Sequence, residues 1–108
     1  FSPEEMTRDF TYIDDIIDVL PRIMRSTLSN GHAIYNLGSS NPKTLIQLVE
    51  AVETACEAST QKVILKKQNG DVSHTYADIS AAKRDFDFAP KVELKDGIKN
   101  FVDWYKNY

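Results

Sequence analysis

The pattern of hydrophobic and polar positions opens with a long amphipathic stretch that starts near Thr11. Asp14 and Asp15 fall in its first turn, where negative charge is favourable for the helix dipole. Pro21 should kink this helix or divide it in two, and Asn30-Gly31 should end it. The apolar residues that recur at the i, i+3, i+4 and i+7 spacing of one buried face are Ile13, Ile16, Ile17, Leu20, Ile23, Met24 and Leu28.

Three further helices are predicted. The segment Ser39–Pro42 offers a cap followed by a proline at the first helical position, and the helix after it should reach about Ala58. Its core-facing residues are Leu45, Leu48, Val49, Val52 and Cys56. Asp78 can cap a short helix through Arg84, and a last helix begins at Leu94. The apolar face of that last helix carries Ile98, Phe101, Val102 and Tyr105, with Trp104 beside it.

Two short segments lack the helical period and are predicted as strands. Residues 33–38 are apolar on both faces and bounded by glycines, which is typical of an interior strand covered on both sides. Residues 62–67 alternate, with Val63 and Leu65 on one side. The order helix, strand, helix, strand, helix, helix indicates the α/β class. Two isolated strands make a poor sheet, because three or more are usually needed, so we expect their neighbours to be missing.

Composition places the chain among ordinary globular domains, since 42% of its 108 residues are hydrophobic and 27% are charged. Its 13 basic and 16 acidic residues include no basic run, which disfavours a nucleic-acid surface. No apolar run suits a membrane span or a signal peptide. The single cysteine, Cys56, cannot form an internal disulfide, so a cytoplasmic location is expected. The chain starts with Phe1 instead of Met, and we expect a chain cut from a longer protein rather than a processed N-terminus.

Several kinds of catalytic site are excluded by residue type and spacing. The four glycines form no G-x-G-x-x-G dinucleotide loop and no P-loop, and no tyrosine has a lysine four residues after it. His32 and His74 lack metal-ligand spacing and are interpreted as surface or turn residues. Asp14 and Asp15 could form a metal or acid/base pair, but adjacent helical residues point apart, so a role at the helix terminus is favoured. We therefore assign no catalytic and no metal-binding residue to the chain.

Four segments, taken in order, resemble blocks found late in extended short-chain dehydrogenase/reductases that act on nucleotide sugars. Residues 8–15, R-D-F-T-Y-I-D-D, resemble the R-D-F/Y-x-x-I/V-x-D block, and residues 35–38, Y-N-L-G, resemble the strand after it. Residues 70–78, G-D-V-S-H-T-Y-A-D, resemble the G-D-V-x-x-T-x-A-D loop, and residues 97–105 resemble the terminal helix. The likeness covers nearly the whole chain, and the closest subgroup is UDP-glucuronate 4-epimerase.

The resemblance implies the C-terminal, substrate-binding portion of a Rossmann-type nucleotide-sugar epimerase, mostly helical with two or three short strands. Residues 1–108 would be one unit, and the NAD-binding Rossmann domain would be missing upstream, together with the family's glycine loop and Tyr-x-x-x-Lys pair. In this family NAD takes a hydride from sugar C4 and returns it to the other face. The chain alone is then expected to be inactive, to bind no NAD, and to pack against the missing domain or self-associate.

The resemblance also assigns two residues to the substrate diphosphate. Arg8 matches an arginine that contacts it, and a guanidinium suits phosphate because it offers charge-assisted, bidentate hydrogen bonds. Without the resemblance, an exposed pair with Glu4 or Glu5 would be the simpler interpretation. Gln68 stands where several relatives have a second phosphate-binding arginine, so the clamp around the diphosphate would carry one charge fewer.

Two further residues are assigned to the sugars. Asp71 matches an aspartate that accepts hydrogen bonds from the uridine ribose hydroxyls, although Gly-Asp is also a common turn pair. Thr75 matches a position near the hexose. Three alternatives remain open: a UDP-glucose 4-epimerase or sugar-nucleotide dehydratase portion, a non-catalytic UDP-binding or assembly module, and a purely structural helical domain. A reading frame that extends about 200 residues upstream would favour the enzyme.

Overall fold

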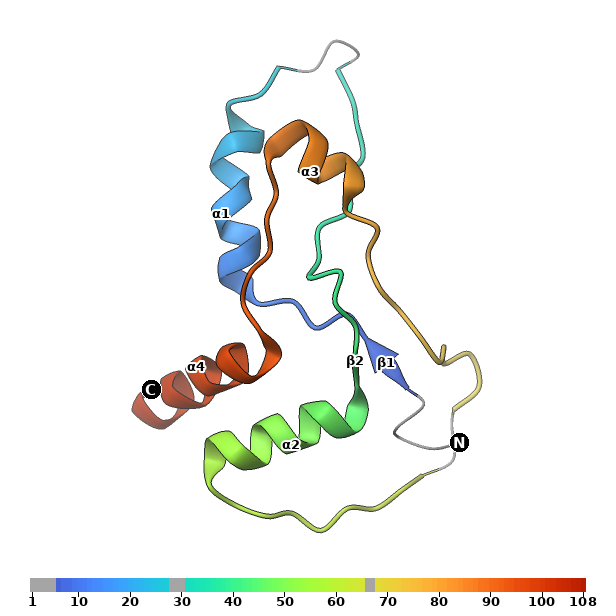
Figure 1. Cartoon of the computed structure of the whole chain (residues 1–108), viewed down its shortest axis with the longest axis vertical. Helices are drawn as coiled ribbons and strands as arrows, with labels where there is room; N and C mark the ends of the chain where they lie inside the picture. Colours follow the sequence, from blue (N-terminus) through green and yellow to red (C-terminus); the bar gives the residue numbers. More distant parts are fainter. Residues whose placement is uncertain (1–5, 28–30, 66–67) are drawn as a thin grey trace.

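Four helices and two very short strands make up the fold, in the order β1, α1, β2, α2, α3, α4 (Figure 1). The computed structural model describes residues 6–27, 31–65 and 68–108. The elements are β1 Thr7–Arg8, α1 Ile13–Met24, β2 Lys43–Thr44, α2 Leu45–Cys56, α3 Ser80–Phe86 and α4 Leu94–Asn107. The predicted class, mostly helices with a small sheet, is confirmed, although the strands lie elsewhere than predicted.

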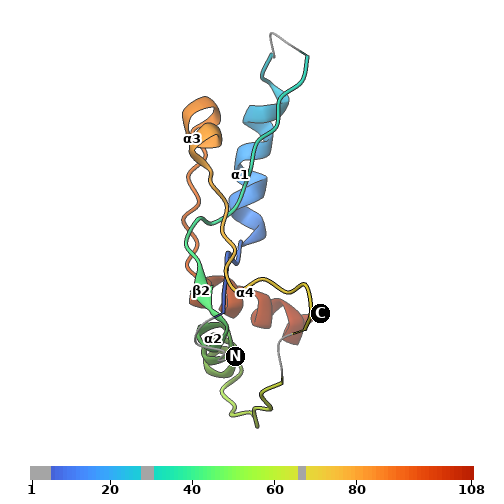
Figure 2. The ribbon, with the colours of Figure 1, turned by 90° about the vertical axis from the view of Figure 1, so that its right-hand side faces the viewer.

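The helices gather in two pairs at opposite ends of a flat molecule of 53 × 37 × 19 Å. α1 and α3 lie side by side at one end, and α2 and α4 lie together at the other (Figures 1 and 2). The two strands lie between the pairs (Figure 1). Within the described ranges, no helix combines the length and the apolar character needed to cross a membrane.

The buried core lies between α1 and α3. It consists of Val19, Ile79, Ala82, Phe86 and Phe88. Ile16 and Ile23 of α1 and Tyr35 and Leu37 of the 33–38 segment pack against it. The first helix therefore buries only one side of its apolar stripe. The side left exposed carries Ile13, Ile17, Leu20 and Met24.

α1 is shorter than predicted but continuous. It runs through Pro21 without being divided, although an interior proline loses its N–H bond and its ring crowds the carbonyl four residues earlier. The helix ends at Met24, before the expected stop at Asn30-Gly31. The reason is a tight turn, in which both the backbone N–H and the hydroxyl of Ser26 donate to the Ile23 carbonyl at 3.1 and 2.6 Å. Leu28 and Asn30 lie outside the described residues.

Neither predicted strand forms. The backbone groups of residues 33–37 make no hydrogen bond in the described structure, and the segment runs openly beside α1 and α3. An apolar pattern on both faces indicates coverage, but a strand also needs a neighbour, and the described chain supplies none to this segment. Residues 62–65 are likewise not a strand, and Lys66 and Lys67 lie outside the described residues.

The sheet that does form is antiparallel and minimal. Thr7 pairs with Thr44 and Arg8 pairs with Lys43. Thr7 also forms a parallel bridge with His74 on its other side. β1 therefore lies between β2 and the segment around residue 74.

α2 begins three residues later than predicted. Its cap is Thr44, whose hydroxyl accepts from the Gln47 N–H at 3.1 Å while the Gln47 side chain accepts from the Thr44 N–H at 2.8 Å. This is a capping box, which satisfies two backbone donors at once. The expected burial of Cys56 is wrong, since its thiol is exposed. The physical reason is that α2 packs on α4, away from the core, and buries no residue completely.

α3 and α4 are close to their predicted positions. The Asp78 carboxylate accepts from the Ser80 hydroxyl at 2.6 Å and from its N–H at 3.1 Å, and the hydroxyl bond in particular lowers the pKa of Asp78. α3 runs two residues past Arg84 to Phe86, and α4 starts at Leu94. On α4, Val102 is buried as expected, but Phe101 and Tyr105 of the same predicted face are exposed.

Candidate functional site

The guanidinium of Arg8 is the centre of the candidate site. Its Nη1 donates to the Thr7 carbonyl at 2.8 Å and to the Ser73 carbonyl at 3.3 Å. Its Nη2 donates to the Val72 carbonyl at 2.7 Å and to Asp71 Oδ1 at 2.9 Å. Two residues 63 positions apart, each expected to contact the substrate, are therefore an ion pair. The Arg8 side chain is 27% exposed and that of Asp71 41% exposed, so solvent reaches both.

The other two expected residues lie on the same strip of chain. The Gln68 carbonyl accepts from the Asp71 N–H at 3.2 Å and closes a turn in which Gly70 has a φ of 84°, a conformation that favours glycine. The Thr75 N–H donates to the Thr7 carbonyl at 3.2 Å. β1 thus holds residues 71–75 beside Arg8, and Gln68 lies in the turn that leads into them. Glu4 and Glu5, the other partners considered for Arg8, lie outside the described residues.

Asp9 is a positioning residue that the sequence did not single out. Its Oδ2 accepts from the Ser40 N–H at 3.0 Å and from the Ala77 N–H at 2.8 Å. A Cβ on Gly38 would lie 2.9 Å from that same oxygen and 2.9 Å from the Ala77 Cβ, so only glycine fits there. One carboxylate therefore joins three segments around an open cavity of about 450 Å³, which Thr75 also lines.

His74 is an exposed residue, as one of the two interpretations has it, but it forms an isolated β-bridge and has a side-chain partner. Its Nδ1 lies 2.8 Å from the Thr7 hydroxyl. Together with the parallel bridge between these residues, this contact fixes the loop that carries Asp71 against β1. The expected phosphate and ribose contacts thus share one framework of backbone and side-chain hydrogen bonds.

No protein-family model matches the chain, but individual proteins do. Protein CapI of Staphylococcus aureus is 34% identical over 119 aligned positions, which cover 95% of this chain and 36% of CapI. UDP-glucuronate 4-epimerase 6 of Arabidopsis thaliana is 37% identical over 117 positions, which cover 97% of this chain and 25% of that protein. The chain thus spans about a quarter to a third of the length of these relatives.

Comparison with solved structures also finds UDP-sugar epimerases. The UDP-glucuronic acid 4-epimerase of Bacillus cereus, in complex with UDP-glucuronic acid and NAD, matches with a TM-score of 0.85 and 30% identity over 99% of this chain and 34% of that chain. The chain is a relative of the C-terminal part of UDP-sugar epimerases. The UDP-glucose 4-epimerase of Thermotoga maritima, solved with UDP-glucose, matches this chain with a TM-score of 0.84 and 25% identity. The match again covers 99% of this chain and 34% of that chain.

The glycines of this chain do not fit the diphosphate of NAD. A dinucleotide is held by a glycine-rich loop at the start of a helix, where bare backbone approaches the phosphates. Here Gly31 and Gly70 lie in separate turns, Gly38 is packed against Asp9, and Gly97 is packed against the ring of Tyr12. The four glycines of this chain therefore form no loop of the kind that holds a dinucleotide diphosphate.

The two aspartates at the start of α1 differ in role. Asp14 is exposed, whereas Asp15 is only 4% exposed and turns inward, so the pair does not converge on one ligand. Asp15 accepts from the backbone N–H groups of Lys91 and Val92, each at 3.1 Å. In the described ranges, no three metal-ligating side chains gather. Asp15 is therefore a structural clamp between α1 and the segment that leads into α4.

A second polar cluster lies beside α3. The Tyr35 hydroxyl donates to Asp85 at 2.6 Å, and Arg84 pairs with the same carboxylate at 2.8 Å. The hydrogen bond from Arg84, followed by that from Tyr35, lowers the pKa of Asp85 to about 2, and the bond to Asp85 raises the pKa of Tyr35. The Tyr35 ring also packs edge-on against Phe86, with centroids 4.8 Å apart. This cluster fastens the open 33–38 segment to α3.

Proposed function

We propose that this chain is the UDP-sugar-binding part of an NAD-dependent nucleotide-sugar 4-epimerase that acts on UDP-glucuronate. The observation that carries the proposal is the junction of Arg8 and Asp71 beside β1, which gathers a phosphate-binding cation and a ribose-binding carboxylate in one partly exposed place. Relatives named as UDP-glucuronate 4-epimerases support it. Gln68 and Thr75 complete the proposed contacts, on the segment that passes the same strand.

In this proposal, UDP binding breaks the ion pair between Arg8 and Asp71, and each of the two residues then contacts the nucleotide. All four N–H groups on the terminal nitrogens of Arg8 are engaged by protein acceptors. A diphosphate oxygen would replace the Asp71 carboxylate at Nη2, because phosphate offers the same charge-assisted geometry. Asp71 would then accept from the ribose hydroxyls. The three carbonyl bonds of Arg8 can stay in place and keep the guanidinium oriented.

A titration with UDP tests these roles. We expect Arg8→Ala to weaken UDP binding by about 1.5–3 kcal/mol and Asp71→Ala by about 0.5–1.5 kcal/mol, since the first bond is to a charged group. Arg25→Ala is the matched control, because Arg25 is exposed and its side chain makes no hydrogen bond or ion pair in the described structure. An Arg8→Ala variant with unchanged UDP affinity would rule out the contact between Arg8 and the diphosphate.

The proposal includes a separate NAD-binding Rossmann domain, encoded upstream of this single unit. The exposed side of α1 and the unpaired 33–37 segment support it, because both offer apolar or hydrogen-bonding surface without a partner in the described chain. On this proposal the chain alone turns over no UDP-glucuronate when NAD is added. Measurable turnover by the chain alone would refute that division of roles. The exposed thiol of Cys56 fits a reducing cytoplasm, which fractionation of the source cells tests.

UDP-glucose is the second candidate substrate. The Thermotoga maritima UDP-glucose 4-epimerase matches almost as well as the UDP-glucuronic acid enzyme, with TM-scores of 0.84 and 0.85. Parallel titrations with UDP-glucuronate and UDP-glucose separate the two, and equal affinities would leave the hexose to be selected by the missing domain. Binding of UDP with an upstream reading frame that encodes no Rossmann domain would favour a non-catalytic UDP-binding module.

A further inference from the structure

Lys43 is the cation that faces Arg8 across the small sheet. The two residues are direct partners in the antiparallel pairing of β1 and β2. Directly opposite residues of an antiparallel pair project from the same face, with Cβ atoms about 4.5–5.5 Å apart. Two positive side chains therefore start side by side, on the face where Arg8 meets Asp71.

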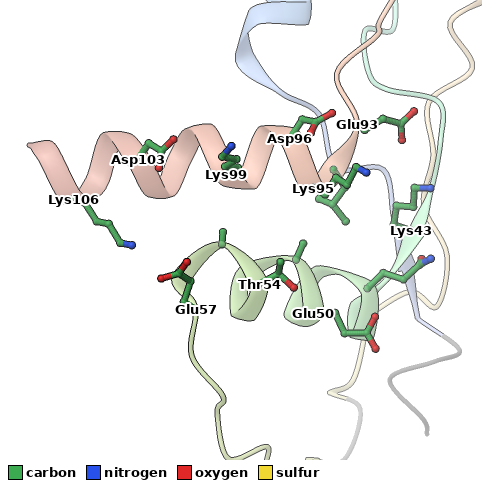
Figure 3. Close-up of a pocket in the computed structure, with 14 residues that line it drawn as sticks. Lys43, Glu50, Thr54, Glu57, Glu93, Lys95, Asp96, Lys99, Asp103 and Lys106 are labelled. Atoms are coloured by element: carbon green, nitrogen blue, oxygen red, sulfur yellow. The ribbon is translucent and has the colours of Figure 1, made fainter.

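Such a pair is unfavourable unless something negative lies nearby. Like charges directly opposite one another destabilise a sheet. Asp71 neutralises Arg8, but the Lys43 ammonium forms no ion pair or hydrogen bond with the described residues. Lys43 is half-buried and lies beside the strands at one end of the groove of about 770 Å³ between α2 and α4 (Figure 3). The pairing of β1 and β2 thus places a second cation beside the candidate phosphate contact.

We infer that Lys43 is a second cationic contact for the diphosphate of the nucleotide, which compensates for the uncharged Gln68. The inference rests on the proposed function. A diphosphate carries more negative charge than one guanidinium offsets, and Gln68 makes no side-chain hydrogen bond in the described structure. A lysine suits this position because its ammonium is a flexible point charge that reaches phosphate without a fixed geometry. Arg8 would orient the diphosphate, and Lys43 would add charge.

The test is a titration of the full chain with UDP and with UMP. Lys43→Gln should weaken UDP binding about 3- to 10-fold, more than it weakens UMP binding, because UMP has one phosphate fewer. Its melting temperature should not fall, since the substitution removes a like-charge neighbour of Arg8. Lys99→Gln is the matched control, a lysine of the same groove on α4, and should leave both affinities unchanged.

The outcomes separate this inference from the proposed function. Unchanged UDP affinity in Lys43→Gln, with a clear loss in Arg8→Ala, overturns the role of Lys43 alone. Equal weakening by Lys43→Gln and Lys99→Gln also overturns it, because the effect would then be one of general charge. A wild-type chain that binds neither nucleotide overturns the proposed function and this inference together.

Discussion

Removal of the Asp15 carboxylate should be among the more damaging single changes to this fold. Asp15 is 4% exposed, and its two oxygens accept from the N–H groups of Lys91 and Val92 at 3.1 Å each. Asp15→Ala leaves both donors without a partner. Each unsatisfied buried donor costs about 1–3 kcal/mol, and the lower end applies because these bonds are only partly buried. The expected loss is about 2–3 kcal/mol in the free energy of unfolding.

Urea denaturation followed by circular dichroism measures this loss. With a slope of about 1–3 kcal/mol/M, the midpoint should fall by roughly 0.7–3 M. Asp15→Asn should lose less, because its carbonyl still accepts one bond while its amide group opposes the second N–H. Protein concentration must be held fixed, since any self-association adds to the apparent stability.

The neighbouring Asp14 provides the control. It lies in the same first turn and is exposed, so Asp14→Ala should stay within about 0.5 kcal/mol of the wild type. The clamp model is wrong if Asp15→Ala and Asp14→Ala have the same midpoint. That result would return Asp15 to the helix-terminal role that the sequence alone suggests.

Four further expectations concern other parts of the molecule. The lowered pKa of Asp85 means that its ionised form stabilises the fold above about pH 4, and that this contribution disappears as the pH falls through about 2. In Asp85→Asn the melting temperature should therefore depend less on pH in this acidic range. Because the pKa of Tyr35 is raised, its contribution is lost above pH 10, and in Tyr35→Phe the melting temperature should depend less on pH in the alkaline range instead. Gly97→Ala should lower the melting temperature, since its Cβ would lie 3.0 Å from the Tyr12 ring, and an unchanged value would mean that the ring moves freely. The unpaired 33–37 segment should make the chain self-associate or fold with low stability, and sedimentation at micromolar concentration that gives a stable monomer would contradict this.

Local sequence patterns predicted helices well where the residues that determine the helix start lie close together in the sequence. α4 starts at Leu94 as its apolar period indicates, and Asp78 bonds the first residue of α3. The start of α2 was missed although the sequence carries it. Thr44-Leu45-Ile46-Gln47 matches the S/T-x-x-E/Q capping box, and it competes successfully with the more obvious cap before Pro42.

Patterns failed where the outcome depends on a distant segment. The two apolar faces of residues 33–38 indicate that other elements cover the segment on both sides. They contain no information on which part of the chain, or which other chain, supplies the neighbouring strands. The carboxylate of Asp15 reaches residues 76 and 77 positions away, which no helix-dipole argument can find. The candidate site shows the same limit. Resemblance located Arg8 and Asp71 separately, but only the fold brings them to 2.9 Å.

The segment from residue 8 to 15 explains why stability and binding are coupled in this molecule. Arg8 holds residues 71–73, Asp9 holds the N–H groups of Ser40 and Ala77, and Asp15 holds the start of the path into α4. Eight consecutive residues thus fasten three distant segments through hydrogen bonds from their side chains to backbone groups. Such bonds do not depend on which side chains the three segments carry. A change at Arg8 therefore alters the loop that presents Asp71 as well as the proposed phosphate contact. For this reason, a loss of UDP affinity is evidence of direct contact only where the melting temperature is preserved. The Lys43 ammonium makes no ion pair or hydrogen bond with the described residues, so its removal allows that test.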